Sequence, residues 1–263
     1  MSAEHFSPVV WGAGASLIAG LATGVGALPV LFFSKPIRPA TNAAMLGFGA
    51  GVMLAATSFS LIIPGIEGAQ RSGYGTMASS SIVAAGMLLG ALALLAANHC
   101  VPHEHFIKGR EGVSAERVSR IWLFVFAITL HNFPEGLAVG VGYGGGDLAN
   151  GTSLAIGIGV QNLPEGLAVA LALRKIGYSA GQAFLIALLT GLAEPLGGIL
   201  GVTAVTASEA LLPWGMAFSA GAMLFVISGE IIPESHRDGK GTAGTVGVVV
   251  GFVLMMLLDT ALA

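Results

Sequence analysis

Eight long apolar stretches, separated by short polar or Pro/Gly-rich links, dominate this sequence of 263 residues. They cover residues 8–33, 41–64, 76–98, 119–143, 149–173, 179–206, 212–233 and 242–262. As a helix, each stretch is long enough to cross about 30 Å of hydrocarbon at about 1.5 Å per residue. Strand-like alternation is weak, so helices rather than a barrel should satisfy the backbone in lipid. We therefore expect an all-α integral membrane protein, with eight transmembrane helices forming one domain over residues 1–263.

The composition agrees with residence in a bilayer. Hydrophobic residues make up 54% of the chain and charged residues only 10%, and the mean hydropathy is +0.84. The 40 glycines favour close helix packing through small residues. The first residues, MSAEHFS, lack a basic segment and a cleavage site, so we expect no removable signal peptide. The net charge of -3 gives no indication of nucleic-acid binding.

The basic residues predict the orientation in the membrane. All eleven Lys and Arg residues except Arg71 fall in or beside the odd-numbered links. Because basic residues gather in cytoplasmic loops, the odd links should be cytoplasmic and both termini outside. This describes a multi-pass protein of the inner cell membrane. The third link, residues 99–118, then becomes a cytoplasmic loop that contains His99, His103 and His105.

The chain repeats two of its own segments. FGAGVMLAATSFSLI (48–62) and FSAGAMLFVISGEII (218–232) share seven residue types at matching places, and the predicted topology runs them in opposite directions. HNFPEGLAV (131–139) and QNLPEGLAV (161–169) form a second pair on the fourth and fifth helices. Inverted repeats of this kind are typical of transporters. We expect helices 1–3 and 6–8 to be related in this way around a central pair, helices 4 and 5.

Three glutamates lie near the middle of predicted spans: Glu135, Glu165 and Glu194. An unpaired charge at the bilayer centre costs about 2.5 to 3.5 kcal/mol even on the lenient scale. No Lys or Arg lies at that depth to neutralise these carboxylates. Protons or a metal ion must therefore do so.

The spacing of the polar residues favours metal. His131 and Glu135 are four residues apart and share one helical face, and Gln161 and Glu165 repeat that spacing on the next helix. One imidazole with carboxylates and amides, but no thiolate, suits zinc, cadmium, iron or manganese. The same donors suit copper(I) poorly.

Asparagines and prolines accompany these residues. Asn132 and Asn162 lie one position further round each helix and offer amide oxygens. Pro134 and Pro164 each remove one helical hydrogen bond, which predicts free carbonyls and a kink beside the polar turn. Pro195 repeats this directly after the third glutamate.

HNFPEG followed by QNLPEG on consecutive spans, and then the glutamate of AEPLGG, resembles the ZIP family of divalent-metal transporters and its bacterial GufA-like branch. The resemblance implies import of divalent metal, foremost zinc, through a binuclear site. At the first metal position it places His131, Glu135, Gln161, Glu165 and Met53. At the second it places Asn132, Asn162 and Glu194, with Glu135 and Glu165 bridging. This chain departs from some relatives, which have Asp at position 162 or His at position 161.

Each of the remaining polar candidates has two possible roles, one functional and one structural. Glu230 is either an auxiliary residue of the transport pathway or a side chain that reaches the cytoplasmic interface. Asp259 either attracts incoming cations or marks the outer interface. The loop histidines His99, His103 and His105 either hold metal that leaves the pore or are simply solvated.

Two further functional classes compete with transport. An intramembrane zinc hydrolase would use metal-bound water as nucleophile and a glutamate as base. The sequence has no HExxH motif and one midplane histidine, and catalysis does not need ligands in a repeat. A receptor would need a recognition domain outside the membrane, and nothing here suggests one. We therefore expect a transporter and not an enzyme, with metal as substrate rather than cofactor and the lipid bilayer as partner; monomer and homodimer both remain open.

Overall fold

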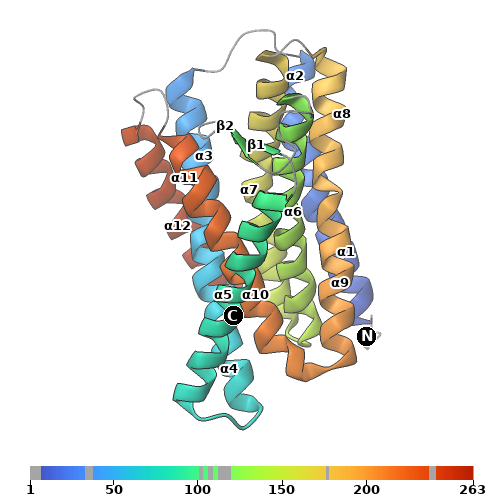
Figure 1. Cartoon of the computed structure of the whole chain (residues 1–263), viewed down its shortest axis with the longest axis vertical. Helices are drawn as coiled ribbons and strands as arrows, with labels where there is room; N and C mark the ends of the chain where they lie inside the picture. Colours follow the sequence, from blue (N-terminus) through green and yellow to red (C-terminus); the bar gives the residue numbers. More distant parts are fainter. Residues whose placement is uncertain are drawn as a thin grey trace.

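A computed structural model describes residues 7–32, 38–100, 103–105, 109–111, 120–175, 178–236 and 241–262. Nearly all of them lie in helices that run along one long axis (Figure 1). One antiparallel ladder pairs β1 (His103–His105) with β2 (Gly109–Glu111). The prediction of an all-α protein is therefore confirmed, with this one short ladder in the third link.

The helices follow one another with few interruptions. In chain order they are α1 (Pro8–Ala27), α2 (Pro29–Phe32), α3 (Pro39–Ala55), α4 (Ile63–Arg71), α5 (Thr76–Cys100), α6 (Arg120–Gly144), α7 (Leu148–Lys175), α8 (Ala180–Gly191), α9 (Ala193–Ala207), α10 (Leu212–Val226), α11 (Ile232–Ser235) and α12 (Gly241–Leu262). A π-helical turn joins α3 to α4 (η1, Ala56–Ile62), another joins α10 to α11 (η4, Ile227–Ile231), and a short 3₁₀ turn precedes α10 (η3, Glu209–Leu211). Because α5 ends at Cys100, the first residues of the predicted 99–118 loop are helical.

Seven helical runs in the described part of the chain are long and apolar enough to cross a membrane. They are Pro8–Phe32, Pro39–Arg71, Thr76–Ala97, Leu148–Leu171, Ala180–Ala207, Glu209–Ser235 and Gly241–Ala261. Each matches one predicted apolar stretch, and α6 occupies the remaining stretch as a continuous helix. The count of eight spans stays a prediction.

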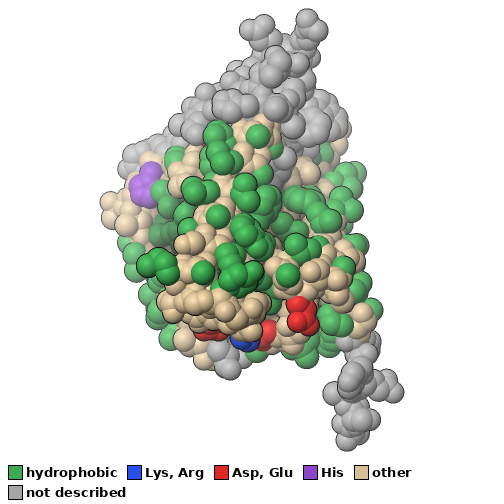
Figure 2. All heavy atoms as spheres, turned by 60° about the horizontal axis from the view of Figure 1, so that its bottom comes forward, with side chains coloured by type: hydrophobic (Ala, Val, Ile, Leu, Met, Phe, Trp, Pro, Cys, Tyr) green, Lys and Arg blue, Asp and Glu red, His purple; other side chains and the backbone are tan. Residues whose placement is uncertain are grey.

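The outer surface of the bundle is apolar. Large hydrophobic side chains are widely exposed, among them Ile18 at 71% and Leu88 at 65%. Figure 2 shows hydrophobic side chains spread over one face, with few charged ones among them. An apolar surface of this extent is costly in water and suits contact with lipid.

Close helix pairs divide the bundle into two groups. In one group α1 packs on α7 and α6 packs on α9, and in the other α3 packs on α12 and α5 packs on α10 (Figure 1). Glycines permit these approaches: a Cβ on Gly166 would collide with the carbonyl of Thr23, and one on Gly51 with the carbonyl of Val248. The many glycines therefore serve packing, as the composition predicts.

The prolines of the repeated motif do not end their helices. α6 continues through Pro134 and α7 through Pro164. The interruption lies instead between α8 and α9, where Leu192 separates two helices two residues before Glu194. The two π-helical turns were not predicted from sequence.

Candidate metal site

The polar residues of α6, α7 and α9 meet inside the bundle. Five of the predicted polar ligands are at most 1% exposed: Asn132, Glu135, Gln161, Asn162 and Glu194. Glu165 is half-buried. The structure therefore gathers the midplane carboxylates and amides from three helices into one place.

Glycines next to the glutamates bring α6 and α9 into contact. A Cβ on Gly136 would collide with the backbone carbonyl of Glu194, and one on Gly197 with that of Phe133. Gly136 directly follows Glu135 in the chain. The two glycines thus allow the backbones that carry Glu135 and Glu194 to lie in contact.

Asn162 connects three helices through its side-chain amide. Its Nδ2 donates to the carbonyl of Ala19 on α1, at 2.8 Å, and to Oε1 of Glu194 on α9, at 2.7 Å. Its Oδ1 accepts from Nε2 of Gln161 at 2.7 Å. Both Nδ2 hydrogens already donate hydrogen bonds. The second lone pair of Oδ1 is therefore the part of this amide that could bind a cation.

Several polar atoms at this place have no hydrogen-bond partner. They include Oε2 of Glu194 and both carboxyl oxygens of Glu135, which lies beside Gln161. On the same helix as Glu135, the side-chain oxygen and nitrogen of the buried Asn132 also have none. A buried polar group without a partner costs about 1 to 3 kcal/mol, and more if it is charged. Glu135 also lies within electrostatic reach of Glu165 and Glu194. A cation bound among these oxygens would satisfy the unpaired oxygens of Glu135 and Glu194 and neutralise the carboxylates.

α3 borders the polar residues of α7. A Cβ on Gly49 would lie 3.8 Å from Oε1 of Gln161, so the backbones of α3 and α7 are close there. Met53, one turn after Gly49, is 1% exposed and belongs to the central apolar cluster. The structure thus puts Met53 on the helix that borders Gln161.

His131 belongs to α6, one turn before Glu135, and its side chain lies outside the described residues. Among the described side chains, no three His, Cys, Asp or Glu residues form a ready metal cage. The described donors are instead carboxylates supplemented by neutral amides.

Asp259 makes contacts that the sequence did not reveal. Its Oδ1 accepts from Oγ of Ser60 at 2.6 Å and from Oγ of Ser153 at 2.9 Å, and both serines are buried. The carboxylate thereby ties α12 to η1 and α7. No local pattern in the sequence indicates these partners, which are 199 and 106 residues away.

The remaining auxiliary candidates are Glu230 and the three loop histidines. Glu230 is half-buried in the π-helical turn η4. His99 belongs to α5, and His103 and His105 to β1, but their side chains lie outside the described residues. Their roles stay predictions.

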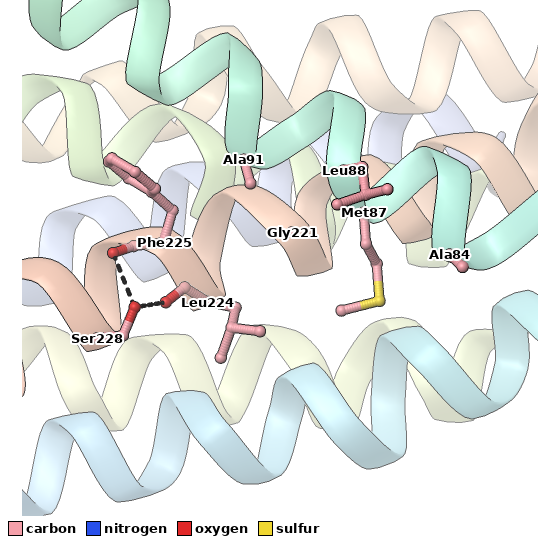
Figure 3. A pocket seen from close by; sticks show the side chains of 8 residues that line it. All are labelled: Ala84, Met87, Leu88, Ala91, Gly221, Leu224, Phe225 and Ser228. Atoms are coloured by element: carbon pink, nitrogen blue, oxygen red, sulfur yellow. Dashed lines mark hydrogen bonds between the residues drawn. The ribbon is translucent and has the colours of Figure 1, made fainter.

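An apolar groove lies between α5 and α10 (Figure 3). Its lining consists of Ala84, Met87, Leu88, Ala91, Gly221, Leu224, Phe225 and Ser228. Oγ of Ser228, the polar side chain among them, donates to the carbonyl of Leu224 at 2.7 Å on its own helix. The groove therefore offers no donor set for a metal, in contrast to the cluster on α6, α7 and α9.

Known proteins resemble this chain over almost its full length. Residues 103–259 match the family described as ZIP Zinc transporter. The chain is 52% identical to the zinc transporter GufA of Myxococcus xanthus, over 94% of this chain and 97% of that protein. It is 48% identical to the zinc transporter ZIPB of Bordetella bronchiseptica, over 92% and 78%. It is 35% identical to the zinc transporter ZIP11 of Homo sapiens, over 91% and 94%.

Proposed function

Since this chain belongs to the ZIP zinc transporter family, we propose that it carries Zn²⁺ across the cell membrane through the polar cluster on α6, α7 and α9. The observation that carries this proposal is the set of buried, unpaired oxygens of Glu135 and Asn132 inside an apolar bundle. The relatives are named as transporters, so transport rather than catalysis is the function of the family. Nothing found here supports an intramembrane hydrolase.

We further propose that import proceeds toward the cytoplasm and that cadmium, iron and manganese are accepted as well. The bias of basic residues to the odd links supports this orientation, with both termini outside. Both ends of the chain lie in the lower half of Figure 1, as an even number of spans requires.

The inverted repeat also belongs to this proposal. α3 packs on α12 much as α10 packs on α5, and α7 packs on α1 much as α6 packs on α9. The predicted repeat relates helices 1, 2 and 3 to helices 6, 7 and 8, and helix 4 to helix 5. When related helices are exchanged, each of these pairings becomes its counterpart. Such pseudo-symmetry supports movement of the group with α6 and α7 against the group with α3 and α10.

Uptake into proteoliposomes tests the function. The purified chain, reconstituted in liposomes that contain a zinc-sensitive dye, should admit Zn²⁺ faster than empty liposomes. The rate should saturate as zinc increases, because a site must be filled in each cycle. Uptake no faster than in liposomes without protein would contradict the proposal.

Binding should also release protons. Ligating carboxylates must be ionised, and burial of several negative charges close together is costly, so the empty cluster should hold protons. Adding Zn²⁺ to the protein in weak buffer should therefore acidify the solution, and binding should weaken as the pH falls. The double variant Glu135→Gln/Glu165→Gln is the control and should release fewer protons. Binding that is equally tight at mildly acidic and neutral pH, without proton release, would show that the carboxylates are already ionised.

Two metal positions should differ in affinity. Glu135, Glu165 and Glu194 supply three negative charges against the four positive charges of two divalent ions, so the second ion should bind more weakly. Asn162→Asp adds a charge where the amide now donates to Glu194. We expect calorimetric titration to show the second Zn²⁺ binding at least about tenfold more tightly in this variant, or ~1.4 kcal/mol. Asn150→Asp, near the other end of α7, is the matched control and should leave both affinities unchanged. Two equally tight sites in the unaltered protein would contradict this prediction.

A further inference from the structure

The carboxylate of Asp259 connects the two groups of helices near one end of the bundle. Its Oδ1 accepts a hydrogen bond from Ser60 of η1 at 2.6 Å, and η1 continues α3, which belongs to the same group as α12. The same oxygen accepts from Ser153 of α7, in the other group, at 2.9 Å. By contrast, the hydrogen bonds of Asn162 join α7 to α1 and α9 within one group. The Ser153 bond is therefore a polar contact between the groups.

Both serines make this contact in place of a local one. A helical serine commonly donates to a backbone carbonyl four residues before it, as Ser58 does to Leu54 at 2.9 Å. Ser60 and Ser153 are 0% and 1% exposed, and each donates to the carboxylate of Asp259 instead. A hydroxyl has one proton to donate, so each serine commits its donor to this carboxylate.

The contact lies at a distance from the polar cluster, toward the predicted outer end of the bundle. Asp259 belongs to the last turn of α12, and Ser153 to the second turn of α7. Gln161 follows Ser153 by eight residues on α7, or about 12 Å along the helix. Between them on α7 are Leu154 and Ile158, which are buried in the central apolar cluster. On α7, apolar packing therefore separates the Asp259 contact from the polar cluster.

The same two helices also pack directly against each other beside this hydrogen bond. Met255 lies one turn before Asp259 on α12, and Gly157 lies one turn after Ser153 on α7. A Cβ on Gly157 would be only 2.5 Å from the sulfur of Met255, which is 1% exposed. α7 and α12 thus form a closed seam between the two groups. If the groups part here, the bond from Ser153 must break, whereas the bond from Ser60 can move with its own group.

We propose that Ser153 is a gating residue, whose hydrogen bond to Asp259 holds the outer end of the transport pathway closed and breaks when the two groups part to admit an ion. This inference rests on the proposed transport by movement of one group against the other. Ser60 stays bonded to Asp259 throughout and orients the carboxylate toward Ser153. A single hydrogen bond suits this role, because it shifts an equilibrium between two states and still breaks in each cycle.

Paired cysteines test this role, because Ser60 and Ser153 contact the same oxygen from different groups. Cys100→Ser first removes the only cysteine of the chain. A short, reducible bifunctional thiol reagent then links Ser153→Cys/Asp259→Cys across the groups. We expect linking to lower zinc uptake in proteoliposomes at least about tenfold, since the linked protein cannot leave the closed state, and reduction to restore it.

The pair Ser60→Cys/Asp259→Cys is the matched control for linking. Its link lies within one group, so its uptake should stay at the rate measured before linking. Mass spectrometry confirms that both pairs are linked. Linked proteins that both keep their own rates would overturn the inference, because α7 and α12 would then not part during transport.

A second measurement needs no transport and applies if the substitution of Asp259 itself stops uptake. Met255→Cys, in the seam beside the bond, reports opening by its reaction with a membrane-impermeant thiol reagent added to spheroplasts. Ser153→Ala should speed this reaction about tenfold, as expected for a lost contact that favours the closed state, whereas Ser60→Ala should leave it unchanged. Equal rates in these two variants would overturn this inference alone. Absence of uptake by the unaltered protein would instead overturn the proposed function.

Discussion

Replacing Glu135 with glutamine or alanine should reduce zinc uptake to background. The side chain is fully buried beside Gln161, and its two carboxyl oxygens are donors that a bound Zn²⁺ would use. Loss of an outer-shell partner of a metal site already costs about 10- to 100-fold. Loss of a direct ligand should reach or exceed the upper end of that range. Initial uptake rates in proteoliposomes, at equal amounts of inserted protein, measure the effect.

Substitutions of the other predicted ligands should reduce uptake to different extents. His131→Ala should also abolish uptake, whereas Gln161→Ala should reduce it less, because a neutral amide coordinates more weakly than a carboxylate. Glu209→Gln, on the exposed turn before α10, is the control and should transport normally. Near-normal uptake by the variants at positions 131, 135 and 161 would show that the metal passes elsewhere.

Gly136→Ala should destabilise the protein and abolish uptake as well. An added Cβ would collide with the backbone carbonyl of Glu194, which cannot turn away as a flexible side chain could. Overpacking typically costs about 1 to 3 kcal/mol, and a clash with backbone belongs at the upper end or beyond. Separation of α6 from α9 would also part Glu135 from Glu194. Thermal unfolding in detergent should show a clearly lower Tm.

Gly14→Ala is the matched control for that experiment. Gly14 is a helical glycine on α1 with nothing within 4 Å of an added Cβ. Alanine there should be neutral or stabilising by about 0.5 to 1 kcal/mol, since it restricts the unfolded chain. Equal Tm and uptake for Gly136→Ala and the unaltered protein would mean that α6 and α9 do not approach as described.

The sequence predicted the parts of the fold that depend on hydropathy and local spacing. Long apolar runs need no tertiary information to be identified, and seven of them appear as helices able to span a membrane. The repeated motif likewise identified Glu135 and Asn162, because polar residues are conspicuous in such runs. Both residues are buried in the structure, and their role as ligands stays a prediction.

Features that arise from contacts between distant helices could not be predicted. The hydrogen bonds of Asn162 to Ala19 and of Asp259 to Ser60 join segments far apart in sequence. The π-helical turns depend on a one-residue shift in hydrogen bonding that composition does not signal. The prolines predict free carbonyls and kinks; α6 continues through Pro134, and the interruption at Leu192, three residues before Pro195, has no separate signal in the sequence.

Anomalous X-ray scattering from crystals of the protein loaded with Cd²⁺ is the most direct test of the account. It shows where the ion binds without relying on transport rates or on variants. The account predicts the strongest anomalous peak among Glu135, Gln161 and Glu165, with a weaker peak near Asn162 and Glu194. A protein that takes up Cd²⁺ but shows its strongest peaks only away from these residues would contradict it.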